Sequence, residues 1–251
     1  MPRAAGAGGG GHVKRKYWAG AALVLCVLCA AALLWPKGGR VIEAAREAVE
    51  NASTNSAGTY VCPVDFASLQ AENADIYAWL YIPGTGINEP LVQREDDSYY
   101  YLSHNSAGKE DASGALFTEA AYNQKDFSDP AVVVYGMNTA KGRLFDGLQA
   151  AYSSPDGLKD FGEIIIYLPE ETLRYQVFAA CPFRSYHLLH YFNFGNENRY
   201  RAFLQAVDSV KTIDANRNRD VAVTPGDPLL ILSTPRTGGS NMSYLVLAKR
   251  I

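Results

Sequence analysis

The stretch Leu229–Pro235 reads L-L-I-L-S-T-P, and a second stretch, Val132–Asn138, reads V-V-V-Y-G-M-N. Both begin as short, uncharged runs of aliphatic residues, which predicts two buried β-strands. The first predicted strand ends at Ser233 and Thr234, which a proline follows. The second ends in a predicted tight turn at Gly136. The sequence therefore predicts two strands that each end abruptly.

A membrane anchor is the clearest feature of the N-terminal part. Tyr17–Trp35 carries no charge and has an aromatic residue at each end. As a helix it would be about 28 Å long, close to the thickness of the hydrocarbon core. Four basic residues and no acidic one precede it, which predicts a cytoplasmic N-terminus. A cleaved signal peptide, with Ala30–Ala32 as its processing site, is the competing interpretation.

We therefore expect a single-pass protein of the cell membrane. Residues 1–16 would form a basic cytoplasmic tail, 17–35 the transmembrane signal anchor, 36–60 an extracellular stalk, and 61–251 one extracellular domain. A short helix is expected in the stalk at Val41–Asn51, followed by a polar linker.

Charge excludes one class of partner. Only 19 of the 23 Lys and Arg follow the four basic residues of the tail, together with all 26 Asp and Glu, so the exported part carries about −7. It has no basic run, and counterion release requires clustered cations. We therefore expect no nucleic-acid partner, and a polyanionic wall polymer is disfavoured for the same reason.

Short strands separated by Gly, Pro and Asn dominate the domain, which predicts a mainly β fold, either a barrel or a sandwich. One clear helix is expected at Glu197–Thr212, and Asp65 is expected to cap a shorter one. The expected strands are Trp79–Ile82, Ile87–Gln93, Gly114–Thr118, Ala131–Tyr135, Glu163–Leu168, Leu173–Ala180, Pro228–Ser233 and Tyr244–Ile251.

Two cysteines, Cys62 and Cys181, lie beyond the anchor. A disulfide between them and two separate small apolar residues are both compatible with the sequence. No metal-ligand spacing, phosphate loop or cofactor fingerprint occurs, so we expect neither a metal nor a cofactor.

Several motifs resemble those of class B sortases, the cysteine transpeptidases of Gram-positive cell surfaces. Ala78–Gln93 reads A-W-L-Y-I-P-G-T-G-I-N-E-P-L-V-Q, Asp97–His104 reads D-S-Y-Y-Y-L-S-H, Gly114–Phe117 reads G-A-L-F, and Lys141–Leu148 reads K-G-R-L-F-D-G-L. With the two strands quoted first, the resemblance covers roughly residues 62–251. It implies a sortase β-barrel of about eight strands with peripheral helices.

The catalytic residues implied by this resemblance are absent. The family's His, Cys and Arg fall on Met137, Pro235 and Ser243. A thioether cannot exchange a proton, and a proline offers neither a nucleophile nor a backbone N–H. A thiolate, a proton donor and an oxyanion-stabilising Arg are all required for this chemistry. We therefore expect a pseudo-sortase that has lost all three roles.

Other polar residues are candidates for the binding groove. His104 matches a family position outside the catalytic set, and we favour a structural hydrogen bond for it. Cys181, with His187 and His190 after it, is an alternative nucleophile; we favour a buried or bridged cysteine and exposed loop histidines. The remaining groove candidates flank the family's catalytic positions: Asn138, Ser233, Thr234 and Arg236, the last able only to bind an anion.

Two classes of function follow. The preferred one is a binding or accessory module that holds a sorting-signal peptide, a surface or pilin protein, or an active sortase. The alternative is a working transpeptidase or hydrolase that anchors surface proteins to the cell wall through a relocated nucleophile such as Cys181. The third hypothesis that the sequence leaves open is a decayed protein that no longer has a function.

Overall fold

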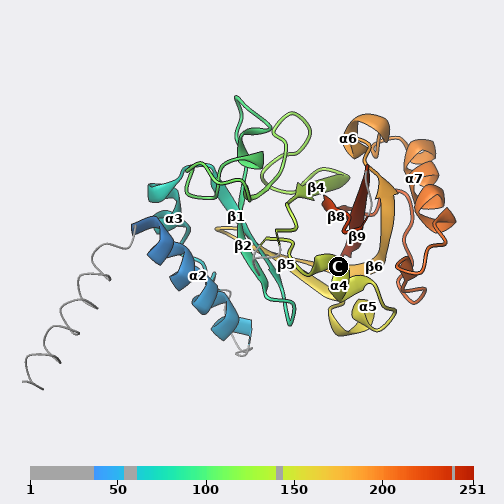
Figure 1. Ribbon diagram of the computed structural model, residues 1–251, viewed down its shortest axis with the longest axis horizontal. Helices are drawn as coiled ribbons and strands as arrows, with labels where there is room; N and C mark the ends of the chain where they lie inside the picture. The colour runs from blue at the N-terminus through green and yellow to red at the C-terminus, as the bar shows by residue number, and fades with distance from the viewer. Residues whose placement is uncertain (1–36, 54–60, 140–143, 239–240) are drawn as a thin grey trace, which may run out of the picture. The chain divides into compact units, whose positions relative to one another are not determined.

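The computed structural model describes residues 37–53, 61–139, 144–238 and 241–251 (Figure 1). The expected cytoplasmic tail and signal anchor lie outside these ranges. Within them, no helix is long and apolar enough to cross a membrane. Contacts divide the chain into Met1–Arg40 and Val41–Ile251, and the second unit holds the fold that follows.

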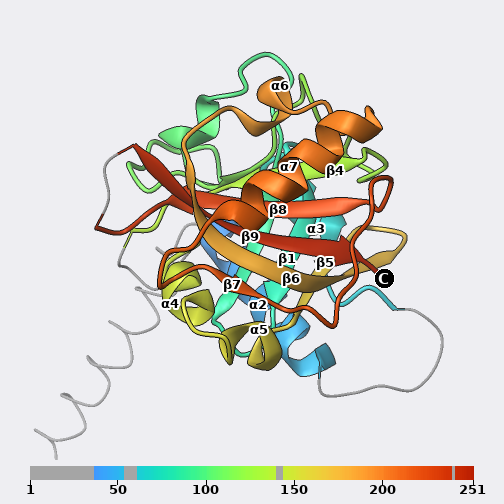
Figure 2. The same cartoon turned by 90° about the vertical axis from the view of Figure 1, so that its right-hand side faces the viewer.

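In the described residues nine strands form one sheet, in the order β5-β1-β2-β3-β4-β8-β9-β6-β7, and an additional β5–β6 pairing closes it. Eight strands thus make a closed barrel (Figure 2), and β7 pairs with β6 at Ala179 and Ala180, beyond the residues of β6 that pair with β5. The expected mainly β barrel is confirmed. The strands are β1 (Ile76–Ile82), β2 (Ile87–Val92), β3 (Leu116–Phe117), β4 (Ala131–Tyr135), β5 (Glu163–Tyr167), β6 (Thr172–Arg184), β7 (Asn216–Arg217), β8 (Leu229–Pro235) and β9 (Met242–Arg250).

Helices cover the barrel on two sides. The expected helix at 197 begins there, capped by the side chain of Asn196, but ends at Ser209 because Val210 is extended. Asp65 caps its short helix as expected, accepting from the backbone N–H of Ser68. The helices are α2 (Lys37–Ser53), α3 (Phe66–Glu72), α4 (Leu148–Tyr152), α5 (Gly157–Asp160), α6 (Leu188–Tyr191) and α7 (Glu197–Ser209), with a 3₁₀ turn at Tyr100–Leu102.

The two faces of β1 show how the layers are built. Every residue of β1 is buried. Ala78, Leu80 and Ile82 point into the apolar interior of the barrel. Trp79 and Tyr81 belong instead to a second cluster, which is formed with α2 and α3. Because side chains alternate along a strand, β1 can serve both cores.

A third cluster lies on the opposite side, between the barrel and helices α6 and α7 (Figure 2). It includes Val133, Ile231 and Leu247 from the central strands, and Phe203 and Val207 from α7. The apolar stripe of α7 therefore covers the outer face of β8, β9 and β6.

Helix α2 is fixed to the barrel by a partly buried ion pair. Arg46 Nη2 lies 2.5 Å from Glu89 Oε2, and Arg46 Nε donates to the carbonyl oxygen of Asn88. The Asn88 side chain in turn accepts from Trp79 Nε1 at 2.6 Å. The compact unit consequently begins at Val41, upstream of the expected boundary at residue 61.

Gly136, at the end of β4, is packed too tightly for any side chain. A Cβ there would lie 2.3 Å from Leu116 Cδ2 and 2.7 Å from Phe145 Cδ2. Both neighbours are fully buried in the barrel interior, so moving either one disturbs the packing around it. Packing therefore favours glycine at the position before Met137.

We expect Gly136→Ala to lower the free energy of unfolding by about 1–3 kcal/mol, because overpacking forces buried side chains out of their rotamers. Urea denaturation of the full chain measures this. Gly195→Ala is the matched control, since the nearest atom is Asn193 Oδ1 at 3.3 Å, on an exposed side chain that can shift; its change should stay within about 0.5 kcal/mol. Equal effects at both positions would contradict the packing argument.

Candidate functional site

Two strands that are distant in sequence end together at one rim of the barrel. Strands β4 and β8 pair in parallel, with Tyr135 opposite Ser233. The N–H of Gly136 extends this ladder by donating to the carbonyl oxygen of Ser233 at 3.1 Å. Strand β9 runs antiparallel to β8 and places Ser243 opposite Pro235.

A groove with a volume of about 480 Å³ opens at these strand ends. Met137, Pro235 and Ser243 all line it, so the structure brings the three family-equivalent positions together. The other lining residues are Tyr99, Tyr101, Leu102, Ala115, Phe117, Glu119, Tyr135, Gly136, Ser185, Tyr186, His187, Ser233, Thr234, Asn241 and Met242.

The three positions offer little chemistry. Met137 is half-buried and packs against the barrel interior. Pro235 is exposed and carries no N–H. The Ser243 hydroxyl lies 3.2 Å from the hydroxyl of Ser185, and either oxygen can be the donor. None of the three provides a thiol, an acid–base group or a positive charge.

The flanking candidates divide into two groups. Ser233 and Thr234 are buried and line the groove. Asn138 instead donates from Nδ2 to Thr237 Oγ1 at 2.9 Å. Arg236 donates from Nε and Nη2 to Asp214 Oδ2, at 3.1 and 2.9 Å. Asn138 and Arg236 are not among the described residues that line the groove, and the Arg236 guanidinium is engaged elsewhere.

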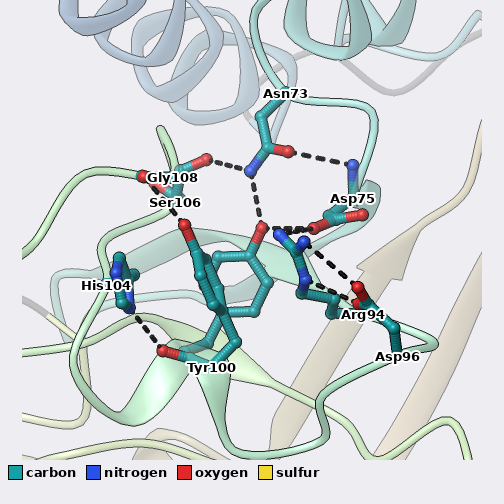
Figure 3. A network of polar contacts seen from close by, with 9 residues as sticks. Asn73, Asp75, Arg94, Asp96, Tyr100, His104, Ser106 and Gly108 are labelled. Atoms are coloured by element: carbon teal, nitrogen blue, oxygen red, sulfur yellow. Dashed lines mark hydrogen bonds and ion pairs between the residues drawn. The ribbon is translucent and has the colours of Figure 1, made fainter.

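His104 belongs to a polar network beside the groove (Figure 3). Its Nδ1 is 2.8 Å from the carbonyl oxygen of Tyr100, and its ring stacks on the Tyr100 ring with centroids 3.8 Å apart. The guanidinium of Arg94 also lies over the Tyr100 ring, at 4.2 Å. These contacts match the structural role that we favoured for His104.

The same network fixes one wall of the groove. Asn73 Nδ2 donates to Tyr101 Oη and to the carbonyl oxygen of Ser106 (Figure 3). Tyr101 Oη donates in turn to Asp75 Oδ2 at 2.7 Å. Burial raises the pKa of Tyr101, so the hydroxyl remains a donor at neutral pH. Tyr101 also lines the groove, so the hydrogen bonds of its hydroxyl to Asn73 and Asp75 fix the position of this wall.

Cys181 lies on β6 in the cluster under α7, and it is not among the described lining residues. Burial raises the pKa of its thiol to about 12. Only the thiolate is a nucleophile, so this side chain is inert near neutral pH. Of the described residues, both cysteines, Cys62 and Cys181, are free, and Cys62 Sγ donates to the carbonyl oxygen of Leu168 at 3.5 Å.

An ionisable pair in the groove was missed by the sequence interpretation. His187 Nε2 lies 3.1 Å from Glu119 Oε1 and 3.0 Å from Glu119 Oε2. His187 Nδ1 accepts from the backbone N–H of His190, which requires the proton to be on Nε2. His190 is exposed as expected, but the expectation of an exposed His187 is wrong, because its side chain is 28% exposed and is hydrogen-bonded to Glu119.

The fold and the groove can now be compared with known proteins. The crystal structure of Staphylococcus aureus sortase B matches with a TM-score of 0.68 at 23% identity, covering 86% of this chain and 99% of that chain. A Staphylococcus aureus sortase B–substrate complex gives a TM-score of 0.65 at 23% identity, with 82% and 91% covered. The fold is therefore that of the class B sortases.

Sequence comparison agrees with the fold. Sortase B of Listeria monocytogenes is 33% identical over 85 residues, which are 34% of this chain and 34% of that protein. Sortase B of Staphylococcus aureus is 27% identical over 174 residues, which are 67% of this chain and 66% of that protein. No protein-family model matches the chain. Taken together, these similarities support the class B sortase family.

We expect Cys181 to resist alkylation by iodoacetamide in the native full chain at pH 8. With its pKa raised to about 12 by burial, the reaction should be at least about a hundredfold slower than in the urea-unfolded chain. Peptide mapping by mass spectrometry distinguishes Cys181 from the half-buried Cys62, which is the internal comparison. Equal rates in the native and unfolded chains would show that Cys181 is accessible and ionised.

Proposed function

We propose that this protein is a membrane-anchored class B sortase-like binding module that holds a peptide without cleaving it. One observation carries the proposal: Met137, Pro235 and Ser243 meet in a groove that is still open. The groove is open enough to hold a ligand. The three positions equivalent to the family's catalytic residues carry no nucleophile, no proton donor and no positive charge for transpeptidation.

The chemistry of acyl transfer supports an inactive groove. Transpeptidation requires a nucleophile, a proton donor for the leaving amine and a group that stabilises the oxyanion. Among the described residues, neither Cys62 nor Cys181 lines the groove. His187 is the one histidine there, and both of its ring nitrogens already have partners in Glu119 and His190.

The ligand is proposed from the chemistry of the relatives. One of the structures with this fold is described as a sortase B–substrate complex, and another as a Streptococcus pyogenes class B sortase involved in pilus biogenesis. For this chain we propose a sorting-signal peptide of a surface or pilin protein, or an active sortase that presents one. The anchor at residues 17–35 and the extracellular position of the domain remain part of the proposal and rest on the sequence.

We expect the full chain to bind a fluorescent sorting-signal peptide, measured by anisotropy, without turning it over in a fluorogenic assay. Ser243→Trp should weaken binding at least about tenfold, because an indole would fill the groove. Ile213→Trp is the matched control, since Ile213 is 98% exposed and does not line the groove.

Turnover that iodoacetamide abolishes would defeat the inactive-groove proposal. If Cys181→Ala also stopped it, the alternative of a relocated nucleophile would replace our proposal. Equal binding by wild type and Ser243→Trp would place the ligand outside the groove.

Restoring the thiol alone should not restore the enzyme. Pro235→Cys would still lack a proton donor and an oxyanion partner, and such electrostatic stabilisation is worth about 3–4 kcal/mol for one donor. We expect no turnover from Pro235→Cys and weak turnover at most from Pro235→Cys, Met137→His and Ser243→Arg combined. The fluorogenic assay measures both variants. Robust turnover by the single variant would mean that another groove residue, with His187 the first to examine, already supplies a catalytic role.

A further inference from the structure

A second concave region lies apart from the groove, between the C-terminal half of α7 and the segment that follows this helix. It consists of two hollows with volumes of about 260 and 330 Å³, and none of their described lining residues belongs to the groove. Asp208, Arg217 and Arg219 line both hollows, so the two meet at these side chains. We call this region the α7 cleft.

Positive charge is concentrated in the α7 cleft. Its described lining residues include three basic side chains, Lys211, Arg217 and Arg219, and one acidic side chain, Asp208. Three positive charges and one negative charge leave a net charge of +2, although the part of the chain beyond the expected anchor carries about −7. A cationic concavity on an otherwise anionic domain attracts anionic ligands.

Arg217 lies at the centre of the cleft, and its hydrogen bonding is incomplete. Strand β7 places Arg217 opposite Ala179 of β6, and the guanidinium carbon lies 5.6 Å from the centroid of the Phe178 ring. Arg217 Nη2 is ion-paired with Asp208 Oδ1, whereas Arg217 Nε is buried and has no hydrogen-bond partner. Buried polar atoms are normally paired, and Arg holds phosphate through two parallel N–H bonds. An anion that binds Nε and a neighbouring Nη would supply the missing acceptor.

The present partner of Arg217 can be displaced by a ligand. The Asp208 side chain is 66% exposed, and an exposed ion pair contributes little to stability. Lys211 Nζ donates to the carbonyl oxygen of Asp208 at 2.9 Å, which offsets the negative end of the α7 dipole. Arg219 is exposed and has neither a hydrogen bond nor an ion pair within the described part of the chain. Arg219 is therefore available to a ligand, and Arg217 becomes available when Asp208 swings away.

The walls of the smaller hollow indicate what the anion carries. Its apolar lining residues are Phe178, Leu204, Val221 and Val223. Leu204, Val221 and Val223 are only partly buried where they pack on the cluster under α7, so part of their apolar surface faces the hollow. A short apolar chain on the ligand would remove this surface from water.

We propose that the α7 cleft binds a phosphate monoester with a short apolar chain, the phosphate on Arg217 and Arg219 and the chain against Phe178. A phosphate monoester carries about −1.5 to −2 charges at neutral pH and offers three acceptor oxygens, which matches a net charge of +2. A carboxylate carries one charge and would leave the cleft cationic. The site is separate from the groove and does not depend on the function proposed for the groove.

The first experiment uses n-hexyl phosphate as the probe. The full chain in the uncharged detergent dodecylmaltoside is titrated at pH 7 by isothermal titration calorimetry, and titration of the detergent alone is subtracted. Inorganic phosphate lacks the chain, and 1-hexanol lacks the charge. We expect n-hexyl phosphate to bind at least about tenfold tighter than either, because each comparison removes one half of the contacts. Equal affinities for n-hexyl phosphate and 1-hexanol would overturn the site.

Variants of the cleft give changes of opposite sign. Arg217→Gln and Arg219→Gln should each weaken n-hexyl phosphate binding at least about tenfold, because each removes a charged donor. Asp208→Asn should tighten it at least about threefold, because the competing carboxylate is lost. The matched controls are Arg201→Gln and Glu197→Gln, which break an exposed ion pair on the same helix outside the cleft. Both controls should bind as wild type does.

The basic residues among positions 1–16 are the same in every variant, so their contribution cancels in these comparisons. Circular dichroism shows whether Arg217→Gln folds; the exposed Arg219 and Asp208 keep the test decisive if it does not. Unchanged binding in Arg219→Gln, weaker binding in Asp208→Asn, or an equal loss in the control variants would overturn the site.

A competition experiment then identifies the source of the phosphate. Dioctanoyl phosphatidate carries a monoester phosphate on a lipid, and dioctanoyl phosphatidylcholine is its control with a zwitterionic headgroup. Displacement of n-hexyl phosphate by phosphatidate alone supports the site and assigns it to a lipid headgroup. Displacement by neither lipid supports the site and assigns it to a soluble ester. Equal displacement by both lipids would show that the phosphate is not recognised and would overturn the proposal.

Discussion

The parallel pairing of β4 with β8 is the constraint on which the site depends. It joins segments about a hundred residues apart, with Val132 opposite Leu230 and Val134 opposite Leu232. These four side chains fill the barrel interior, while Val133 enters the cluster under α7. A shift of one residue would exchange the faces of a strand, so burial on both sides fixes the register. The fixed register determines which side chains emerge at the rim.

The groove needs a second support, because its outer wall is a loop. The segment between β2 and β3 has little regular structure beyond one 3₁₀ turn, and a loop of this length is held only by specific contacts. Tyr101 supplies them by turning its ring to the groove and its hydroxyl to Asn73 and Asp75. The barrel thus forms the floor of the groove, and the partly buried polar network, drawn in Figure 3, holds the wall at Tyr101.

Local sequence patterns predicted where the strands lie. Tertiary contacts determine the features that these patterns did not predict. Aliphatic runs and turn residues located β4 and β8, but β6 continues from the expected end at Ala180 to Arg184 because β9 pairs with it there. The Glu119–His187 pair joins residues that are 68 positions apart, and no local spacing signals such a contact. An acidic residue, Glu119, two positions after the G-A-L-F motif was the one available hint.

The position of Pro235 explains how the fold can tolerate the substitution. Proline lacks an N–H, yet Pro235 remains opposite Ser243, and the next residue restores the ladder when Arg236 N donates to the carbonyl oxygen of Met242. Pro235 is exposed, and neither it nor Ser243 belongs to an apolar cluster. Residues at the ends of barrel strands can therefore change their chemistry while the core is unaltered. The proposed inactive groove relies on the same separation between core and rim, because the barrel holds the groove open whichever side chains stand at its rim.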